Sequence, residues 1–336
     1  MIPPGKLDVP TSVDGNLEPE FMHQPRRDSA PPSDKADTRQ RLLAGVELGG
    51  TKCICILASG PDDVRETIRV PTTTAEETLG RIRTVLERWK AVADVEAVGI
   101  GSFGPLQLNP RADGFGSIVS TPKPGWSGAD LTSLALGLKI PVAIDTDVNG
   151  AALAEGRWGG AKDLRSFAYV TVGTGIGVGS IVGGLPVRGV GHSEAGHLRI
   201  ARLAGDVWPG ACPYHGDCVE GLAAGPALLA RTGRRGETLA PDDPVWDSVV
   251  HALGGLFHNL VLTAAPEVIL VGGGIITGNP HLLPRLRAAL VRSLNGYAAG
   301  ERISQNVEAY VASPMLRAMA GPLGAIALAA TSLNRP

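Results

Sequence analysis

The sequence predicts an α/β protein of two domains with a cleft between them. Its 336 residues are too many for one compact core and suit two domains of ordinary size. A strand, a glycine/threonine turn and a returning strand occur twice, near Gly49 and near Gly173. Because helical and strand patterns alternate around both, we expect two similar α/β halves that face each other, and ligands commonly bind in such clefts.

The composition narrows the class of protein. Hydrophobic residues make up 43% and charged residues 19% of the chain, which is the balance of a soluble globular protein. The net charge of -2 offers no basic field for nucleic acid or a membrane surface. No apolar run has the length of a membrane span, and the N-terminus lacks a signal-peptide core. We therefore expect a cytoplasmic protein with reduced cysteines.

The N-terminal half begins with a polar, proline-rich stretch without apolar period. Residues 1–41 are expected to be a disordered tail, and Met22 is a candidate for the true start. Apolar spacing then predicts strands and helices in turn. The predicted strands are Leu43–Leu48, Cys53–Ala58, Val95–Gly101 and Val142–Asp145, and the predicted helices are Ala75–Ala91 and Ala151–Trp158.

The C-terminal half restarts the same pattern. A strand, the turn Gly173-Thr174-Gly175 and a returning strand come first, and longer helices follow. The predicted strands are Phe167–Val172, Val178–Val182, Val268–Val271 and Val307–Val311, and the predicted helices are Val245–Ala264, Leu282–Ser293 and one from Pro322 onward.

Glycine turns are the candidate phosphate-binding segments. Backbone N–H groups in such a turn can point together at an anion. The candidates are Gly49-Gly50-Thr51 with Lys52 beside it, Gly173-Thr174-Gly175, and the run Gly272-Gly273-Gly274 after a buried strand. Each turn alone also fits a plain hairpin or loop. A triphosphate needs several cradles, so three such runs together favour a nucleotide site.

Another glycine pattern, Gly99-Ile-Gly101-Ser-Phe-Gly104, resembles a dinucleotide-binding fingerprint. Pro105 follows it, so no helix begins there to offer its N-terminus to a pyrophosphate. This argues against a dinucleotide-linked dehydrogenase.

A cluster of sulfur and imidazole ligands lies between residues 197 and 218. The spacing Cys212-x2-His215-x2-Cys218 in a loop rich in glycine and proline, with His197 upstream, matches a closed tetrahedral zinc site. The alternative is a reduced cysteine pair with a surface histidine.

Three carboxylates are candidates for the chemistry. Asp147 follows a buried strand and precedes a helix of small residues, a position that faces the cleft of an open α/β sheet. It could accept a proton from an alcohol that attacks phosphorus, although it or Asp145 could instead cap the helix. Glu194 and Glu220 flank the zinc candidates and could accept hydrogen bonds from sugar hydroxyls, or they could be solvated surface residues.

At this point the chain resembles the ROK family of sugar kinases and repressors, and most closely its bacterial zinc-containing fructokinase branch. The resemblance runs from about Ala44 to Ala330. Its motifs are Glu47-Leu-Gly-Gly-Thr-Lys52, Thr146-Asp147-Val-Asn149-Gly-Ala-Ala, Val172-Gly-Thr-Gly-Ile-Gly177, Glu194-Ala-Gly-His197 and the cysteine loop that ends Cys218-Val-Glu220.

The resemblance implies an actin-like (ribonuclease H-like) two-domain ATPase fold, and a homodimer. With the tail at residues 1–41, the N-terminal domain would comprise residues 42–147 and 318–334, and the C-terminal domain residues 148–317. Asp147 would be the catalytic base. Glu194, His197, Glu220, Asn149 and Gly104 would contact the sugar. The nucleotide, with Mg²⁺, would meet Gly49, Gly50, Thr51, Lys52, Thr174, Gly175, Gly225, Pro226 and Gly272–Gly274. Zn²⁺ would bind His197, Cys212, His215 and Cys218.

Departures from the family pattern bear on the substrate. Glu47 stands where many members have Asp, His215 replaces one thiolate, and Thr146 replaces an Asn that usually contacts the sugar. The form Thr121-Pro-Lys-Pro-Gly-Trp126 resembles the fructokinases. We therefore expect ATP-dependent phosphorylation of D-fructose to fructose 6-phosphate. The alternatives are another hexose or N-acetylhexosamine kinase, acting for example on mannose or glucose, and a sugar-responsive repressor. The repressor would need a DNA-reading helix-turn-helix before Leu42, which the tail does not suggest.

Overall fold

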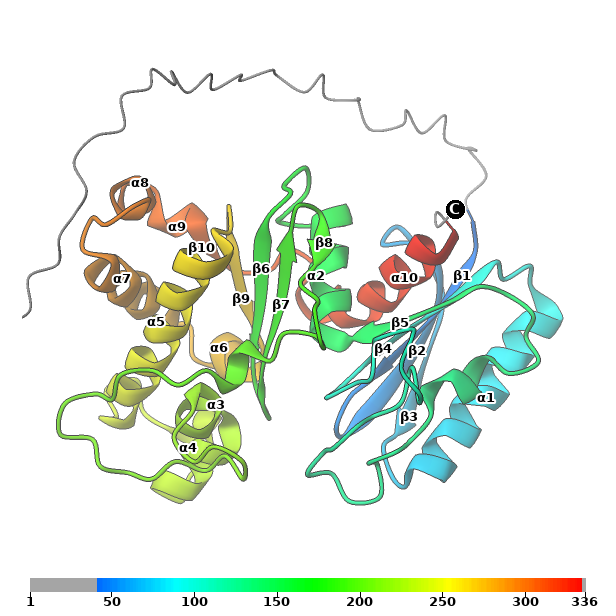
Figure 1. Cartoon of the computed structure of the whole chain (residues 1–336), viewed down its shortest axis with the longest axis horizontal. Helices are drawn as coiled ribbons and strands as arrows, with labels where there is room; N and C mark the ends of the chain where they lie inside the picture. The colour runs from blue at the N-terminus through cyan, green and yellow to red at the C-terminus, as the bar shows by residue number, and fades with distance from the viewer. Residues whose placement is uncertain (1–40, 334–336) are drawn as a thin grey trace, which may run out of the picture. The chain divides into compact units, whose positions relative to one another are not determined.

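The computed structural model describes residues 41–333 (Figure 1). Apart from Arg41, the expected tail lies outside the described residues, and so does Met22. From Arg41 onward the chain forms one compact unit by its contacts. It contains two five-stranded sheets. The division of this unit into two domains at the residues named above stays a prediction.

The first sheet has the order β3-β2-β1-β4-β5. Strand β1 pairs antiparallel with β2 and parallel with β4, and β4 pairs parallel with β5. In register, Leu48 lies beside Ser102, and Ser102 lies beside Thr146. The residues that follow these three strands therefore lie at one edge of the sheet. The bounds are β1 Leu43–Leu48, β2 Lys52–Gly60, β3 Asp63–Pro71, β4 Ala97–Ser102 and β5 Val142–Thr146.

The second sheet has the order β10-β9-β6-β7-β8. Read from its other edge, this is the order of the first sheet, so β6 corresponds to β1, β7 to β2 and β9 to β4. The internal repeat read from the two glycine turns is therefore confirmed as a duplicated sheet. The bounds are β6 Phe167–Val172, β7 Ile176–Val182, β8 Leu185–Pro186, β9 Ile269–Gly272 and β10 Val311–Ala312.

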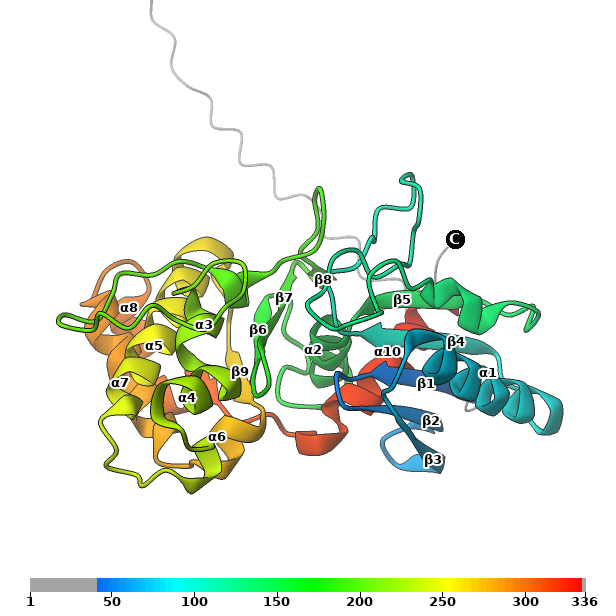
Figure 2. The ribbon, with the colours of Figure 1, turned by 90° about the horizontal axis from the view of Figure 1, so that it is seen from below.

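Helices α2 (Asp147–Trp158) and α10 (Ala320–Leu333) pack against each other between the two sheets (Figures 1 and 2). Their contact depends on small residues. A Cβ built on Gly324 would lie 2.4 Å from the carbonyl carbon of Gly150, so any side chain at residue 324 would push the helices apart. Helix α10 also packs on β1 and β4, and α2 on β6 and β7.

The other helices lie outside this central pair. Helix α1 (Ala75–Val92) buries Leu79, Ile82, Leu86 and Trp89, which recur at helical spacing. Beside the second sheet, α5 (Val245–Ala264) packs on α7 (Leu282–Leu294). The shorter helices are α3 Val219–Ala223, α4 Gly225–Thr232, α6 Gly274–Gly278, α8 Gly300–Gln305 and α9 Val307–Tyr310.

Glu155 of α2 joins the two connections between the sheets. Its side chain is fully buried and accepts hydrogen bonds from the N–H of Gly160 (2.7 Å), on the way to β6. It also accepts from Met315 (3.2 Å) and Leu316 (2.8 Å), on the way back to α10. One carboxylate therefore holds both crossover segments.

Two sequence expectations need correction. The segment Val307–Val311, read as a strand, is helix α9 with only Val311 continuing into β10. Its valines suit a strand, but so short an apolar run cannot override the surrounding packing. The helix expected at Ala151–Trp158 begins at Asp147, because Thr146 caps it. Strand β3 was not anticipated. It is an edge strand with mostly exposed side chains, so it lacks a clear apolar pattern.

Within residues 41–333, no helix is both long enough and apolar enough to cross a membrane.

Candidate active site

Asp147 is the first residue of α2, directly after β5. Thr146 is the N-cap, with its hydroxyl accepting from the N–H of Asn149 (3.2 Å). The capping alternative for Asp147 or Asp145 is therefore wrong. The Asp147 carboxylate accepts a hydrogen bond from the N–H of Val148 (2.9 Å). Its Cα lies 3.4 Å from the position that a Cβ on Gly101 would take, so the end of β4 packs closely against the start of α2.

Asp145 has a different environment, although it is only two residues away. It is fully buried, pairs with Arg188, and accepts from the side-chain amide of Asn149 (2.9 Å). The Asn149 side chain is therefore buried and bonded to Asp145. In this structure Asn149 supports the start of α2, and its expected contact with the sugar stays a prediction.

Carboxylates surround Asp147 and change its acidity. Burial, with the charge of Glu194 adding to it, raises the pKa of Asp147 to about 6, although the N–H of Val148 opposes this shift. Burial and the charge of Asp147 raise the pKa of Glu47 to about 7, against the opposing charge of Lys52. Burial and neighbouring acids, Glu47 and Asp147 among them, raise the pKa of the Tyr169 hydroxyl on β6. The carboxylates of this region therefore raise one another's pKa in addition to the effect of burial.

The first glycine turn joins β1 to β2. The N–H of Gly49 donates to the carbonyl of Lys52 (3.1 Å), and the Thr72 hydroxyl donates to the carbonyl of Gly49 (2.8 Å). Gly50, Thr51 and Lys52 are exposed, and the ammonium of Lys123 donates to the carbonyl of Gly50 (2.6 Å). The turn therefore has free backbone N–H groups and two nearby lysines, which suits an anion.

The other candidate glycine runs converge at the end of the second sheet. The parallel register of β6 and β9 sets Thr171 beside Gly272. The N–H of Gly225 donates to the carbonyl of Gly173 (2.8 Å). A Cβ on Gly173 would lie 3.9 Å from the nitrogen of Gly274, and a Cβ on Gly273 would clash with Val172 backbone at 2.4 Å. The expected nucleotide residues at 173–175, 225 and 272–274 thus form one cluster.

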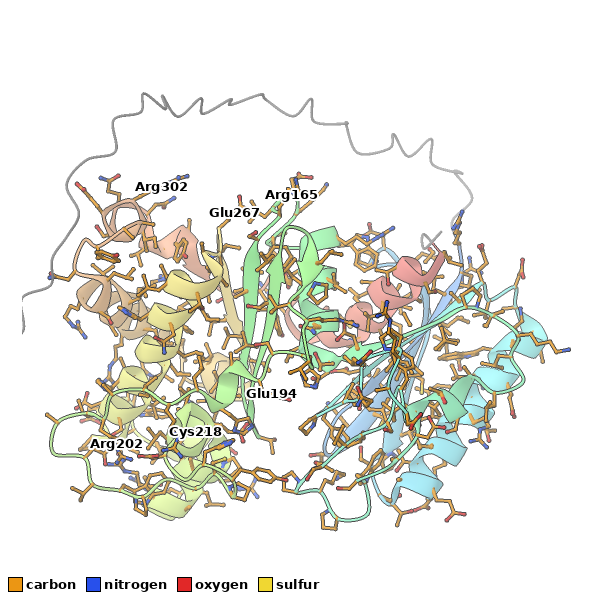
Figure 3. The ribbon with its side chains drawn as sticks, viewed as in Figure 1. Arg165, Glu194, Arg202, Cys218, Glu267 and Arg302 are labelled. Atoms are coloured by element: carbon orange, nitrogen blue, oxygen red, sulfur yellow. The ribbon has the colours of Figure 1, made fainter. Side chains whose placement is uncertain are left out.

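The candidate sugar residues connect both halves. Gly104 lies against Glu194 and His192: a Cβ on Gly104 would lie 3.3 Å from Glu194 Oε1 and 3.3 Å from His192 Cε1. Burial raises the pKa of Glu194, and the charge of Glu220 adds to this shift. Figure 3 shows Glu194 and Cys218 toward the same end of the second sheet, opposite the end that carries Arg165 and Glu267.

Glu220 of α3 links the second glycine turn to the histidine and cysteine cluster. One carboxylate oxygen accepts from the N–H of Ile176 (2.9 Å), directly after Gly175. The other lies 3.8 Å from Nε2 of His197. A side chain on Gly175 would clash with Glu220, because its Cβ would lie 2.7 Å from Oε2. Glu220 is therefore held between the turn and the cluster.

The cluster brings the four predicted metal ligands together. Their ligand atoms all lie within 4.8 Å of one another. His197 Nδ1 is 3.6 Å from the sulfur of Cys212 and 3.6 Å from that of Cys218, and His215 Nδ1 is 3.7 Å from Cys212. A tetrahedral zinc ion with ligands at about 2.3 Å (sulfur) and 2.0–2.1 Å (nitrogen) sets such atoms roughly 3.6 Å apart. The donor set therefore fits a zinc ion, with Nε2 of His197 left to face Glu220.

The loop that carries these ligands is held by an ion network. Asp206 accepts two hydrogen bonds from Arg231 (2.8 and 3.1 Å) and one from Ser248 (3.0 Å). Burial opposes its ionisation, but these donors and the N–H of Trp208 outweigh it and lower the pKa of Asp206 to about 2. Within the same loop, Arg202 donates a hydrogen bond to Asp217 (3.0 Å), the residue before Cys218.

Sequence reasoning missed four residues near the site: Glu47 as a charged neighbour of Asp147, Lys123 at Gly50, Arg188 at Asp145, and His192 at Gly104. Glu47 and Lys123 lie inside motifs that were noticed, so their charge was an available signal. Arg188 and His192 act across 43 and 86 residues of sequence, and local spacing carries no signal for such contacts.

The duplicated sheet with glycine turns at both halves defines the class: an actin-like (ribonuclease H-like) ATPase fold. A glucokinase of the ROK family from Streptomyces griseus, solved in complex with glucose and AMPPNP, superposes with a TM-score of 0.68 and 26% identity, covering 86% of this chain and 99% of that chain.

Comparison of the sequences gives the family. The model of the ROK family matches residues 43–332. A fructokinase from Pediococcus pentosaceus is 41% identical over 76% of this chain and 88% of its own length. A fructokinase from Lactococcus lactis subsp. cremoris is 39% identical over 81% of this chain and 91% of its own length. The chain belongs to the ROK family.

Proposed function

We propose that this protein is an ATP-dependent hexose kinase that phosphorylates D-fructose to fructose 6-phosphate. The observation that carries the proposal is the placement of Asp147. Its carboxylate stands where β5 ends, at the same sheet edge as the first glycine turn and Gly104, and close to Glu194. Relatives named fructokinase at 39–41% identity support fructose as the acceptor.

Asp147 would act as the general base. A pKa of about 6 leaves the carboxylate ionised at neutral pH yet more basic than an ordinary aspartate, which suits removal of a proton from the attacking hydroxyl. The proton moves from the sugar oxygen to the Asp147 carboxylate as that oxygen bonds to the γ-phosphorus and the bond to the β-phosphate oxygen breaks. Such a transfer depends mainly on positioning and charge neutralisation.

The nucleotide would be held by the glycine runs. Backbone N–H groups at 49–51 and the hydroxyl of Thr174 would meet phosphate oxygens, with Lys52 supplying positive charge. Gly225, Pro226 and Gly272–Gly274 would meet the nucleoside side. Mg²⁺ would enter with ATP and neutralise phosphate charge. Glu47 and Asp147, whose charges interact, would supply carboxylate oxygens of the kind that Mg²⁺ prefers. Closure of the site around both ligands would exclude water.

Zinc would support the sugar side of the site. We infer that His197, Cys212, His215 and Cys218 bind one Zn²⁺ as a closed structural centre, because four suitable donors are already gathered. The ion would fix the loop between His197 and α3, and this loop sets the positions of His197 and Glu220. His197 would then serve both the metal, through Nδ1, and the sugar pocket, through Nε2.

We also infer that the protein works in the cytoplasm as a homodimer, as the family resemblance implies. Sedimentation equilibrium should give twice the 34.7-kDa chain mass. A single-chain mass at micromolar concentration would exclude the dimer.

A panel of sugars in a coupled ADP-release assay tests the proposed function. We expect fructose to give the highest kcat/KM, with mannose, glucose and N-acetylhexosamines lower. Preference for one of those sugars by tenfold or more would move the assignment to another kinase of this family. Absence of sugar-dependent ADP release from folded, metal-loaded protein would refute it.

A further inference from the structure

One segment of the second half reaches over to the first sheet. After β8, the residues Val187–Glu194, here called the strap, form a small hairpin in which Arg188 pairs with His192. The N–H of Gly189 donates to the carbonyl of Gly191 (2.9 Å), and the tip at Val190 is exposed. The strap begins beside β7, where the N–H of Val187 donates to the carbonyl of Ser180 (2.9 Å). It ends at Glu194, a candidate sugar residue.

Arg188 and His192, the two paired residues of the strap, each contact a segment of the first half. One segment lies at the end of β5 and the other follows β4. Arg188 pairs with the buried Asp145 at the end of β5, two residues before Asp147. His192 accepts a hydrogen bond at Nε2 from the N–H of Leu106 (2.9 Å), in the segment after β4. The strap therefore contacts the segment that ends β5, beside Asp147, and the segment that follows β4, beside Gly104.

The histidine at residue 192 is built into this position. Its side chain is only 3% exposed. Because Nε2 accepts from a backbone N–H, it carries no proton, so the proton of the neutral ring lies on Nδ1. That nitrogen faces the carbonyl of Ser193 at 3.3 Å and Glu194 Oε1 at 3.5 Å. On the other side the ring lies against Gly104.

We propose that His192 is a positioning residue for the sugar: it fixes the backbone of 104–106 and the carboxylate of Glu194 relative to each other, so that both walls of the pocket meet the same ring. This inference rests on the proposed function, because it concerns the pocket of that reaction. The absence of a side chain at Gly104 supports the same role for His192. It leaves room for the imidazole and Glu194, and any side chain there would contact both.

Loss of the imidazole acceptor should weaken sugar binding more than nucleotide binding. In His192→Leu the N–H of Leu106 loses its partner, and an unpaired buried N–H is costly. The segment then shifts, and both walls move. The contacts of His192 described above are with Gly104, Leu106 and Glu194 and not with the glycine runs, so the affinity for ATP should hold.

The test compares the KM for fructose, the KM for ATP and kcat in His192→Leu and His192→Gln. A glutamine can place an acceptor oxygen near the position of Nε2, so it should rescue part of the effect. We expect the KM for fructose to rise about tenfold or more in the leucine variant and about threefold in the glutamine variant, with less than a twofold change in the KM for ATP.

His251→Leu is the matched control. His251 also ties a loop by a backbone hydrogen bond, from Nε2 to the carbonyl of Ala201 (2.8 Å), but it lies on α5 outside the site. We expect wild-type values for both KM constants there. An unchanged KM for fructose in His192→Leu, or an equal rise of both KM constants, would overturn the inference. Wild-type protein without sugar-dependent turnover would instead refute the proposed function.

Discussion

At the scale of single residues, the acidity of Asp147 is a product of its surroundings. Burial and the charge of Glu194 raise its pKa to about 6, while Asp145, two residues earlier, is paired with Arg188 and Asn149. Asp147 therefore has a raised pKa, and Asp145 holds the start of α2. The same short motif thus contains a candidate base and its support.

Replacing Asp147 with Asn should remove the base and leave the fold intact. We expect kcat to fall by a factor of about 10² to 10⁴, the usual contribution of a positioned base. Because burial raises the pKa of Asp147, its ionised form destabilises the folded state above about pH 6, so the neutral amide should hold or raise the melting temperature at pH 8. Turnover and thermal unfolding measured on one preparation check this. Near-normal turnover would rule out the base assignment.

The pH dependence of kcat/KM for fructose gives an independent check on the same residue. The base works only when unprotonated, so activity should fall as the pH drops through the pKa values of Asp147, about 6, and Glu47, about 7. An ordinary aspartate would keep activity down to about pH 4. We expect an acid limb between pH 7 and 6 at saturating Mg²⁺–ATP. Constant activity down to pH 5 would contradict the raised pKa of Asp147.

At the scale of elements, the loop of residues 199–217, which precedes α3, is held by side-chain contacts more than by regular structure. Residues 199–217 contain no strand or helix of their own. Asp206, Arg202 and Arg231 hold its middle, and the four metal candidates hold its end. Because Glu220 lies two residues after Cys218, the order of this loop decides where that carboxylate lies.

Cys218→Ser tests the role of the cluster. Cys218 also caps α3, and serine is a good N-cap, so this substitution removes a metal ligand while it keeps the cap. We expect zinc content to fall from about one ion per chain to far less after dialysis against metal-free buffer, with a lower melting temperature and a higher KM for fructose.

Cys55→Ala is the control for that experiment, because Cys55 is a buried thiol of β2 away from the cluster. It should lose some stability and keep its zinc. Wild-type protein without zinc, measured by elemental analysis, would remove the metal centre from the account.

The features that could be predicted from the sequence are those set by residues close together in the chain. The strand–turn–strand repeat, α1, Asp147 at a strand end and the Cys-x2-His-x2-Cys spacing are properties of neighbouring residues, and all of them lie in the structure as expected. Strand β3 lacks a clear apolar pattern, and the strap depends on contacts made far along the chain. His192 illustrates this, since its partner Leu106 is 86 residues earlier.

At the scale of the whole molecule, duplication explains why the site has two sides. Each half places a glycine turn between its first two strands, and the central helices α2 and α10 join the sheets behind them. Glu155 ties the outgoing and returning connections to α2. The strap ties the second half to the first near Asp147.

The central claim is that the carboxylate of Asp147 directs the terminal phosphate of ATP to the hydroxyl on C6 of fructose. Phosphorus and carbon NMR of the sugar product, after complete turnover of a stoichiometric amount of ATP, tests it most directly. The account predicts one new phosphate ester, on O6 of fructose, and none with Asp147→Asn over the same time. A phosphate on another oxygen, or free phosphate with no phosphorylated sugar, would contradict it.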